Sequence, residues 1–368
     1  MEQTRLLLAI LLTFLVFVAW EFFFSSRQDV QAPPDQAQQS SPRESDAQPA
    51  TVKDVEPAAP VTAPPAPAAQ PGTPQQPGRR ISVDTPLFKI VIAEKGGRFE
   101  ELILKQFRES VGPDAAFKSL FQPNGGSRNM RFGFKENSVP GLEGAVYTAL
   151  NAEDQLMVRD KAEKVVLAWT SVDGVEIQKT YTFHPDSYLI DVVVQVTNRG
   201  TRLLKDSATL SVAREMGESQ RGVVFEGPSG VIDNKLKEIA VGDIEDNPIN
   251  AGLISWVGVV DRYFMAALMP IEAAPGKMQV SLSESQEIAN TLVLAEKDIA
   301  PGQTRTFAFK AFYGPKNTNL LKSYGYSLVK AINFGWFDFL AKPALWIMNM
   351  IYSVIPNYGI AIILLTVM

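Results

Sequence analysis

Few residues of this 368-residue sequence have side chains suited to catalysis. The chain contains no cysteine and one histidine, which excludes cysteine nucleophiles, thiolate metal sites and every site that needs two imidazoles. That histidine, His184, precedes Pro185-Asp186-Ser187, a turn signal, so the sequence favours an exposed hairpin histidine over a general base. The sequence has no P-loop, no G-x-S-x-G elbow and no glycine-rich dinucleotide fingerprint after a strand. We therefore expect a protein that is not an enzyme and has no catalytic residue.

The charged residues point to no bound cofactor or metal ion. Asp243, Glu245 and Asp246 form an acidic cluster, but the spacing of an EF-hand is absent, and a solvated loop is favoured over a cation site. The chain has 35 Lys+Arg and 40 Asp+Glu, a net charge of -5, and so provides no basic field that would hold nucleic acid. We expect no cofactor, no metal ion and no nucleic-acid partner.

The first apolar segment, residues 6–24, has the length of one membrane crossing. As a helix, its 19 residues cover about 28 Å, close to the roughly 30 Å of the hydrocarbon core. Bulky side chains follow instead of a small-x-small cleavage site, which favours an uncleaved anchor over a cleaved signal peptide. We expect residues 1–27 to form an N-terminal transmembrane anchor, N-in and C-out, with Leu6, Phe14 and Trp20 as its membrane and interface residues.

Residues 28–78 have the composition of a linker. They hold 12 of the 25 prolines, 10 alanines and 9 glutamines, and no aromatic residue. Such a segment cannot bury enough apolar surface to offset its chain entropy. We expect a disordered, extended tether, with a proline-rich ligand for a partner's groove as the alternative.

Between residues 79 and 315 the hydrophobic period becomes two. In residues 187–197, every second residue from Tyr188 to Val196 is apolar and lies on one face of a strand. Similar runs occur at residues 87–93, 102–107, 165–170, 175–183, 203–212, 253–269, 278–282 and 304–313. Turn residues separate the runs, and no helical pattern of 10–15 residues lies between them. We expect a mainly β protein in which this region forms a large antiparallel β-sandwich.

After Pro315 the pattern becomes helical, and residues 316–356 predict a helical linker followed by an amphipathic helix. A narrow polar stripe and a broad apolar face with tryptophans are typical of a helix in the bilayer interface. We expect Trp336, Asp338, Lys342 and Trp346 to lie there, the two charged residues at the i, i+4 spacing that allows pairing. The alternative is a helix docked on the sandwich, and Pro343 is expected to bend or break it.

A last apolar run starts at Tyr358, and the sequence stops inside it at Met368. Twelve helical residues, 357–368, reach only about 18 Å, and a charged carboxylate at that depth in a bilayer is costly. We expect the start of a second transmembrane helix, with Tyr358 at the interface, in a truncated piece of a longer multi-pass protein.

This order of segments resembles the YidC-type membrane protein insertases of Gram-negative bacteria, the form with a large periplasmic domain. The matching stretches are Gly96-Gly97 in AEKGGRFEELIL, WVGVVDRYFMAALMP at residues 256–270, Gly314-Pro315-Lys316, and NFGWFDFLAKPALWIMNMIYSVIPNYGIAIILLT, which contains Gly335-Trp336, Lys342-Pro343 and Asn357-Tyr358-Gly359. The resemblance covers nearly the whole chain, and the last stretch is the most specific.

The resemblance implies a fold, a function and partners. The fold is a periplasmic β-supersandwich, and the function is to help inner-membrane proteins insert, fold and assemble, alone or with the Sec translocon. The implied partners are nascent membrane proteins, the Sec translocon with its accessory subunits, and the lipid bilayer, with residues 28–330 in the periplasm. The family's substrate groove and its basic residue are expected beyond Met368, so the groove residues are unknown. The alternatives are a membrane-tethered periplasmic protein that binds or modifies carbohydrate, and a pure scaffold.

Overall fold

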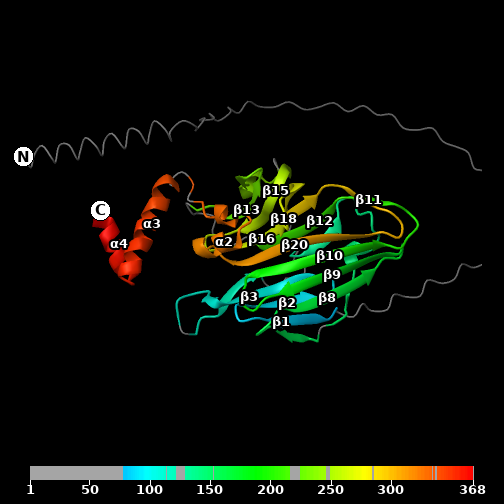
Figure 1. Cartoon of the computed structure of the whole chain (residues 1–368), viewed down its shortest axis with the longest axis horizontal. Coiled ribbons are helices and arrows are strands. Elements are labelled where there is room, and N and C mark those ends of the chain that lie inside the picture. Colours follow the sequence, from blue (N-terminus) through cyan, green and yellow to red (C-terminus); the bar gives the residue numbers. More distant parts are fainter. Residues whose placement is uncertain are drawn as a thin grey trace, which may run out of the picture. The chain divides into compact units, whose positions relative to one another are not determined.

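The computed structural model describes residues 78–367 except 113, 122–128, 152, 216–223, 246–248, 284–285, 334, 336 and 337. The expected anchor, with Leu6, Phe14 and Trp20, and all but the last residue of the expected linker lie outside the described residues. Most of the described chain is β-strand, followed by helices at its C-terminal end (Figure 1). This is the mainly β architecture expected from the sequence.

The larger sheet has thirteen strands. Its path runs β5-β12-β18-β17-β15-β16-β20-β10-β9-β8-β6, with β13 paired to β15 and β14 paired to β13. Its strands are β5 (Arg131–Phe134), β6 (Thr148–Ala149), β8 (Glu163–Thr170), β9 (Val175–Phe183), β10 (Leu189–Asn198), β12 (Ala208–Glu215), β13 (Gly227–Ile232), β14 (Lys235–Glu238), β15 (Ile249–Val260), β16 (Phe264–Pro270), β17 (Ala274–Leu282), β18 (Glu287–Leu294) and β20 (Thr304–Pro315). All of its pairings are antiparallel.

The smaller sheet has five strands in the order β4-β3-β2-β1-β7. They are β1 (Arg80–Asp84), β2 (Phe88–Ala93), β3 (Arg98–Arg108), β4 (Phe117–Phe121) and β7 (Gln155–Met157). Only β1 and β7 pair in parallel. A separate ribbon joins β11 (Leu204–Asp206) to β19 (Lys297–Ile299), and short 3-10 turns lie at η1 (Leu142–Gly144) and η2 (Val241–Asp243).

The two sheets pack face to face through large side chains. Phe99 of β3 lies 4.9 Å from Tyr181 of β9 and 5.9 Å from Tyr313 of β20, measured between ring centroids. Phe88 of β2 lies 6.5 Å from Phe183 of β9. All five of these residues are at most 1 % exposed. Alternation in each strand therefore builds one shared core, as in a sandwich.

Two of the expected strands are interrupted by an aspartate. The run 253–269 divides into β15 and β16 because the Asp261 carboxylate accepts hydrogen bonds from the backbone N–H groups of Tyr263 and Phe264, which closes a turn. The run 203–212 divides into β11 and β12 after Asp206, whose carboxylate accepts from Ser207 N at 2.6 Å.

The chain leaves the sandwich through two short helical turns that pack on it. The helical pattern of the sequence forms two separate elements, α2 (Thr318–Tyr324) and η3 (Leu328–Ala331), and not one continuous helix. The helix ends because Gly325 between them has φ 79°. Leu321 and Leu328 are fully buried, and the Tyr324 hydroxyl accepts from the Tyr188 N–H at 3.0 Å. This segment is therefore part of the sandwich.

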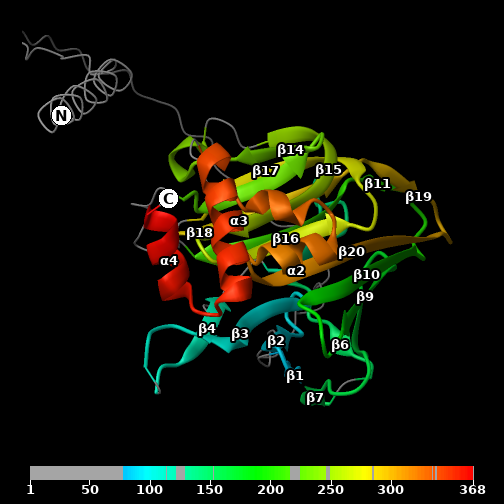
Figure 2. The ribbon, with the colours of Figure 1, turned by 60° about the vertical axis from the view of Figure 1, so that its left-hand side comes forward.

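α3 (Asp338–Val354) and α4 (Tyr358–Val367) follow and pack against each other (Figure 2). Pro343 lies inside α3 and does not end it. The Asn357 side chain caps α4 by accepting from the N–H groups of Gly359 and Ile360. No helix among the described residues combines the length and apolar composition that crossing a bilayer requires.

Candidate functional site

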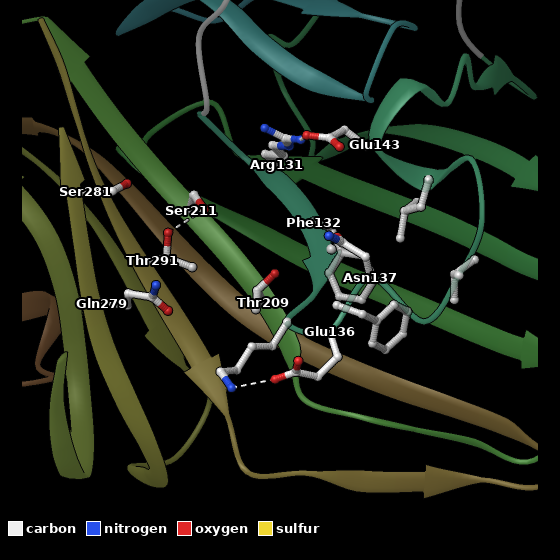
Figure 3. Close-up of a pocket in the computed structure, with 15 residues that line it drawn as sticks. Arg131, Phe132, Glu136, Asn137, Glu143, Thr209, Ser211, Gln279, Ser281 and Thr291 are labelled. Carbon is white, nitrogen blue, oxygen red and sulfur yellow. Dashed lines mark hydrogen bonds and ion pairs between the residues drawn. The ribbon is translucent and has the colours of Figure 1, made fainter. Parts of the chain in front are cut away.

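The described residues form a polar groove of about 450 Å³ on the large sheet. Hydroxyl and amide side chains from three strands form its floor: Thr209 and Ser211 of β12, Gln279 and Ser281 of β17, and Thr291 of β18 (Figure 3). They share one face because Ser211 pairs with Thr291 and Thr291 with Gln279 in the sheet register, so their side chains point the same way. Alternate residues such as Leu210 and Leu292 enter the core.

The charged residues at the groove are paired with one another. Arg131 contacts Glu143 at 2.5 Å, and Lys135 contacts Glu136 at 2.6 Å (Figure 3). Both carboxylates are well exposed, so water competes with these ion pairs. The groove therefore offers hydrogen-bond donors and acceptors but little net charge.

The single histidine contacts an aspartate that is also paired with a lysine. His184 Nε2 lies 2.8 Å from an Asp191 carboxylate oxygen, and Lys310 contacts the other oxygen. The His184 side chain is 35 % exposed, so it is partly buried and less accessible than the exposed hairpin histidine that the sequence predicted. Burial acts to raise the pKa of Asp191, but hydrogen bonds from Lys310 and His184 outweigh it and hold that pKa below its ordinary value. His184 does not line the polar groove.

A buried lysine is the least expected titratable group. Lys179 of β9 is fully buried; its ammonium donates to Gly96 O at 2.7 Å and lies 4.6 Å from the centre of the Tyr147 ring. Burial, with a smaller contribution from the charge of Arg131, lowers the pKa of Lys179 to about 7. Sequence reasoning missed this residue, although its place between Ile177 and Tyr181 in the alternation pointed it inward.

The acidic cluster forms no metal site in the described part of the chain. Asp243 ends η2, Glu245 follows in a turn, and Asp246 lies outside the described residues. No group of three His, Asp or Glu side chains among the described residues is arranged to hold a metal ion.

The structure places three of the four expected interface residues of residues 316–356 in α3. Asp338 and Lys342 stand four residues apart on that helix, and Trp346 is 66 % exposed. Trp336 lies outside the described residues. Tyr358 begins α4 and stacks on Tyr352 of α3, with ring centroids 4.0 Å apart. Contact of these residues with a membrane stays a prediction.

Comparison with known proteins gives a family. A family model described as "YidC periplasmic domain" matches residues 80–347. A relative from Geobacter sulfurreducens named "Membrane protein insertase YidC" is 32% identical over 291 residues, 77% of this chain and 54% of the relative. One of the same name from Geobacter metallireducens is 30% identical over 375 residues, 99% of this chain and 67% of the relative. The chain thus spans about half to two thirds of the length of these relatives.

Solved structures show a more distant likeness. One, a galactose mutarotase related enzyme from Lactobacillus acidophilus, has a TM-score of 0.44 and 10% identity, covering 64% of this chain and 97% of that one. At these values the likeness supports no conclusion about activity. The sequence matches are sufficient, because the family model covers well over half of the chain. The chain belongs to the YidC family and carries its periplasmic domain, a periplasmic segment of an inner-membrane protein.

Proposed function

We propose that this chain is part of a membrane protein insertase and chaperone that helps inner-membrane proteins insert, fold and assemble, alone or with the Sec translocon. The observation that carries the proposal is the match to a relative named an insertase over 99% of this chain, beyond the periplasmic domain into α3 and α4. The protein acts by binding and guiding its clients, nascent membrane proteins, and is not an enzyme.

The proposed arrangement gives each segment a place. Residues 1–27 anchor the chain with Leu6, Phe14 and Trp20, and residues 28–78 tether the sandwich, residues 79–315, in the periplasm. Residues 316–356 return the chain to the membrane surface through Trp336, Asp338, Lys342 and Trp346, and residues 357–368 begin the second crossing at Tyr358. The exposed apolar side chains of α3 and α4, including Met350, Ile362 and Ile363, support contact with lipid.

The sugar-modifying form of the carbohydrate alternative lacks a supporting geometry among the described residues. A sugar-modifying enzyme needs a convergent acid–base pair in its pocket, and the carboxylates at the polar groove, Glu136 and Glu143, are each held in an exposed ion pair. His184 belongs to a separate network and does not line that groove. Replacing His184 with alanine is therefore expected to leave the protein's activity intact.

The test is reconstitution. The whole open reading frame that contains this chain is placed in liposomes, with and without the Sec translocon, and insertion of a client membrane protein is followed by protection from protease. We expect insertion above the level of empty liposomes, and none from a chain that ends at Met368. Equal insertion in empty and loaded liposomes would overturn the proposal, and full activity of the chain ending at Met368 would overturn the placement of the groove beyond it.

A further inference from the structure

The β3–β4 hairpin carries an exposed apolar tip. The tip projects beyond the body of the sheets (Figures 1 and 2), and its Val111 side chain is fully exposed. At its base, Phe117 is 47 % exposed. A neighbouring turn between β15 and β16 presents Tyr263, 65 % exposed. Three large apolar side chains are thus exposed on the hairpin and on the turn beside its base.

This surface lies at the end of the sandwich from which the chain leaves for α3 and α4. Phe107, at the end of β3, packs edge-on against Phe264 with ring centroids 5.2 Å apart. Phe264 is paired in register with Pro315, the last residue of the last strand. The base of the hairpin and the end of β20, where the chain turns into α2, therefore share one end of the sandwich.

Two arginines accompany the aromatic rings. The Arg108 guanidinium lies 5.0 Å from the centre of the Phe117 ring, and that of Arg262 lies 6.0 Å from the Tyr263 ring. Both arginines are exposed, and among the described residues neither has an ion-pair partner. Aromatic rings beside arginine stems are typical of the headgroup level of a bilayer, where the charge also attracts anionic lipid.

Two of the described acidic residues near these turns are held in ion pairs. Glu109 is paired with Lys118 at 2.8 Å, and Asp261 is paired with Arg214 at 2.9 Å. Asp114 is an exposed carboxylate of the tip that offsets part of the arginine charge. Among the described residues, the surface therefore combines two arginines outside ion pairs with exposed apolar side chains, within a chain whose net charge is -5.

The chain length keeps this end close to α3. Residues up to Asn333 are fixed to the sandwich, since Leu328 is fully buried and Asn333 donates to Glu238 at 2.9 Å. α3 begins at Asp338, so five Cα steps of at most about 3.6 Å bridge no more than roughly 18 Å. Glu238 pairs with Ser229 and Ser229 with Gly258, two residues before the end of β15, so the start of α3 stays near the β15–β16 turn.

We propose that the tip of the β3–β4 hairpin and the β15–β16 turn contact the headgroup region of the same bilayer that holds α3 and α4, with Arg108 and Arg262 binding anionic lipid. The inference rests on the membrane placement given under Proposed function. It adds a second contact between the sandwich and the membrane, besides the chain itself.

The absence of cysteine makes a clean test available, because one introduced cysteine is the only site of labelling. The full chain is reconstituted in vesicles of phosphatidylethanolamine and phosphatidylglycerol, with a nitroxide on the lipid headgroups as quencher. An environment-sensitive fluorophore is attached at Val111→Cys, at Val172→Cys or at Ile363→Cys. Val172 is 91 % exposed in the β8–β9 turn at the opposite end of the sandwich, and Ile363 of α4 is 65 % exposed.

We expect the fluorophore at Val111 to be blue-shifted and quenched by the labelled lipid, and the one at Val172 to be neither. Replacing both arginines (Arg108→Gln with Arg262→Gln) is expected to weaken the contact by about fivefold per arginine in anionic vesicles. The matched control Arg202→Gln removes an exposed charge near Val172 and is expected to change nothing.

The other outcomes separate the two proposals. Quenching at Ile363 with none at Val111 overturns the hairpin contact and leaves the membrane placement standing. A blue shift at Val111 without lipid quenching also overturns it, in favour of a protein partner at this surface. No quenching at Ile363 overturns the membrane placement and the inference that rests on it.

Discussion

The close contact between Gly97 and the buried Lys179 shows why the Gly96-Gly97 pair occurs in this chain. Gly97 has φ +53°, and a Cβ at this position would lie 3.2 Å from both Lys179 and Tyr147 side-chain carbons. Its carbonyl accepts from the Tyr181 hydroxyl at 2.6 Å. Glycine is therefore required at position 97 for two reasons: the left-handed backbone conformation and the lack of space for a Cβ. The close packing and the Tyr181 hydrogen bond join the β2–β3 turn of the small sheet to β9 of the large one.

Replacing Gly97 with alanine is expected to destabilise the sandwich by about 2–4 kcal/mol, from the left-handed backbone and the crowding together. The matched control is Gly302→Ala, which has φ +78° but nothing within 4 Å of the added carbon, and it should cost only about 1 kcal/mol. Thermal unfolding of the two variants, followed by near-ultraviolet circular dichroism, measures the difference. Equal losses of stability in the two variants would mean that the side chains around Gly97 move aside for the added carbon without a loss of free energy.

Lys179 predicts how the stability of the sandwich depends on pH. Burial lowers the pKa of Lys179 to about 7, far below the value in the unfolded chain, so the unfolded state binds more protons between pH 7 and 10. Stability from this group therefore rises with pH in that window, approaching about 1.4 kcal/mol per pH unit.

Lys179→Met is expected to remove this slope, because methionine fills the space of the alkyl stem without a proton to bind. Chemical unfolding at pH 7, 8 and 9 compares the variant with wild type and with Lys164→Met, whose lysine is exposed on the neighbouring strand β8. The control should keep the wild-type slope. If stability still rises with pH in Lys179→Met, the pH dependence comes from another titratable group.

At the scale of elements, the alternation of apolar residues predicted the long central strands and missed strands that depend on their neighbours. The run 175–183 coincides with β9, since every second residue from Val175 to Phe183 is buried. β13, in contrast, contains Pro228 and two glycines, a composition unfavourable to strands. It forms because Gly230 allows close approach: a Cβ there would lie 2.9 Å from Trp256 O of β15.

The polar groove was beyond sequence reasoning for a related physical reason. Its floor comes from β12, β17 and β18, whose residues 209–211, 279–281 and 291 are far apart in sequence. Only the register of the sheet places them on one face, and a shift of one residue would turn them into the core. Alternation predicts that each strand has a polar face, but it does not predict which polar faces meet.

At the scale of the whole molecule, the short connection between the sandwich and α3 couples the position of the β domain to that of α3 and α4. Tyr324 and Trp256 tie the connecting segment to the sandwich, through hydrogen bonds with Tyr188 N at 3.0 Å and Ser327 O at 3.3 Å. Gly335 is exposed, and nothing lies within 4 Å of the position of a Cβ there, so it is a tolerant point for insertion.

Inserting about twelve glycine and serine residues after Gly335 adds roughly 20 Å of flexible chain and is expected to release the sandwich from the bilayer without unfolding it. The fluorophore at Val111 should then lose its quenching by labelled lipid, while the one at Ile363 keeps it. The same insertion beside Gly174, in the β8–β9 turn, leaves the connection unchanged and should preserve quenching at Val111. Quenching at Val111 that survives the longer connection would show that the hairpin binds lipid strongly without the short connection. The modest charge of this surface predicts only a weak intrinsic affinity for lipid, so the short connection supplies much of the contact by keeping the hairpin at a high effective concentration near the bilayer. We therefore expect quenching at Val111 to be lost.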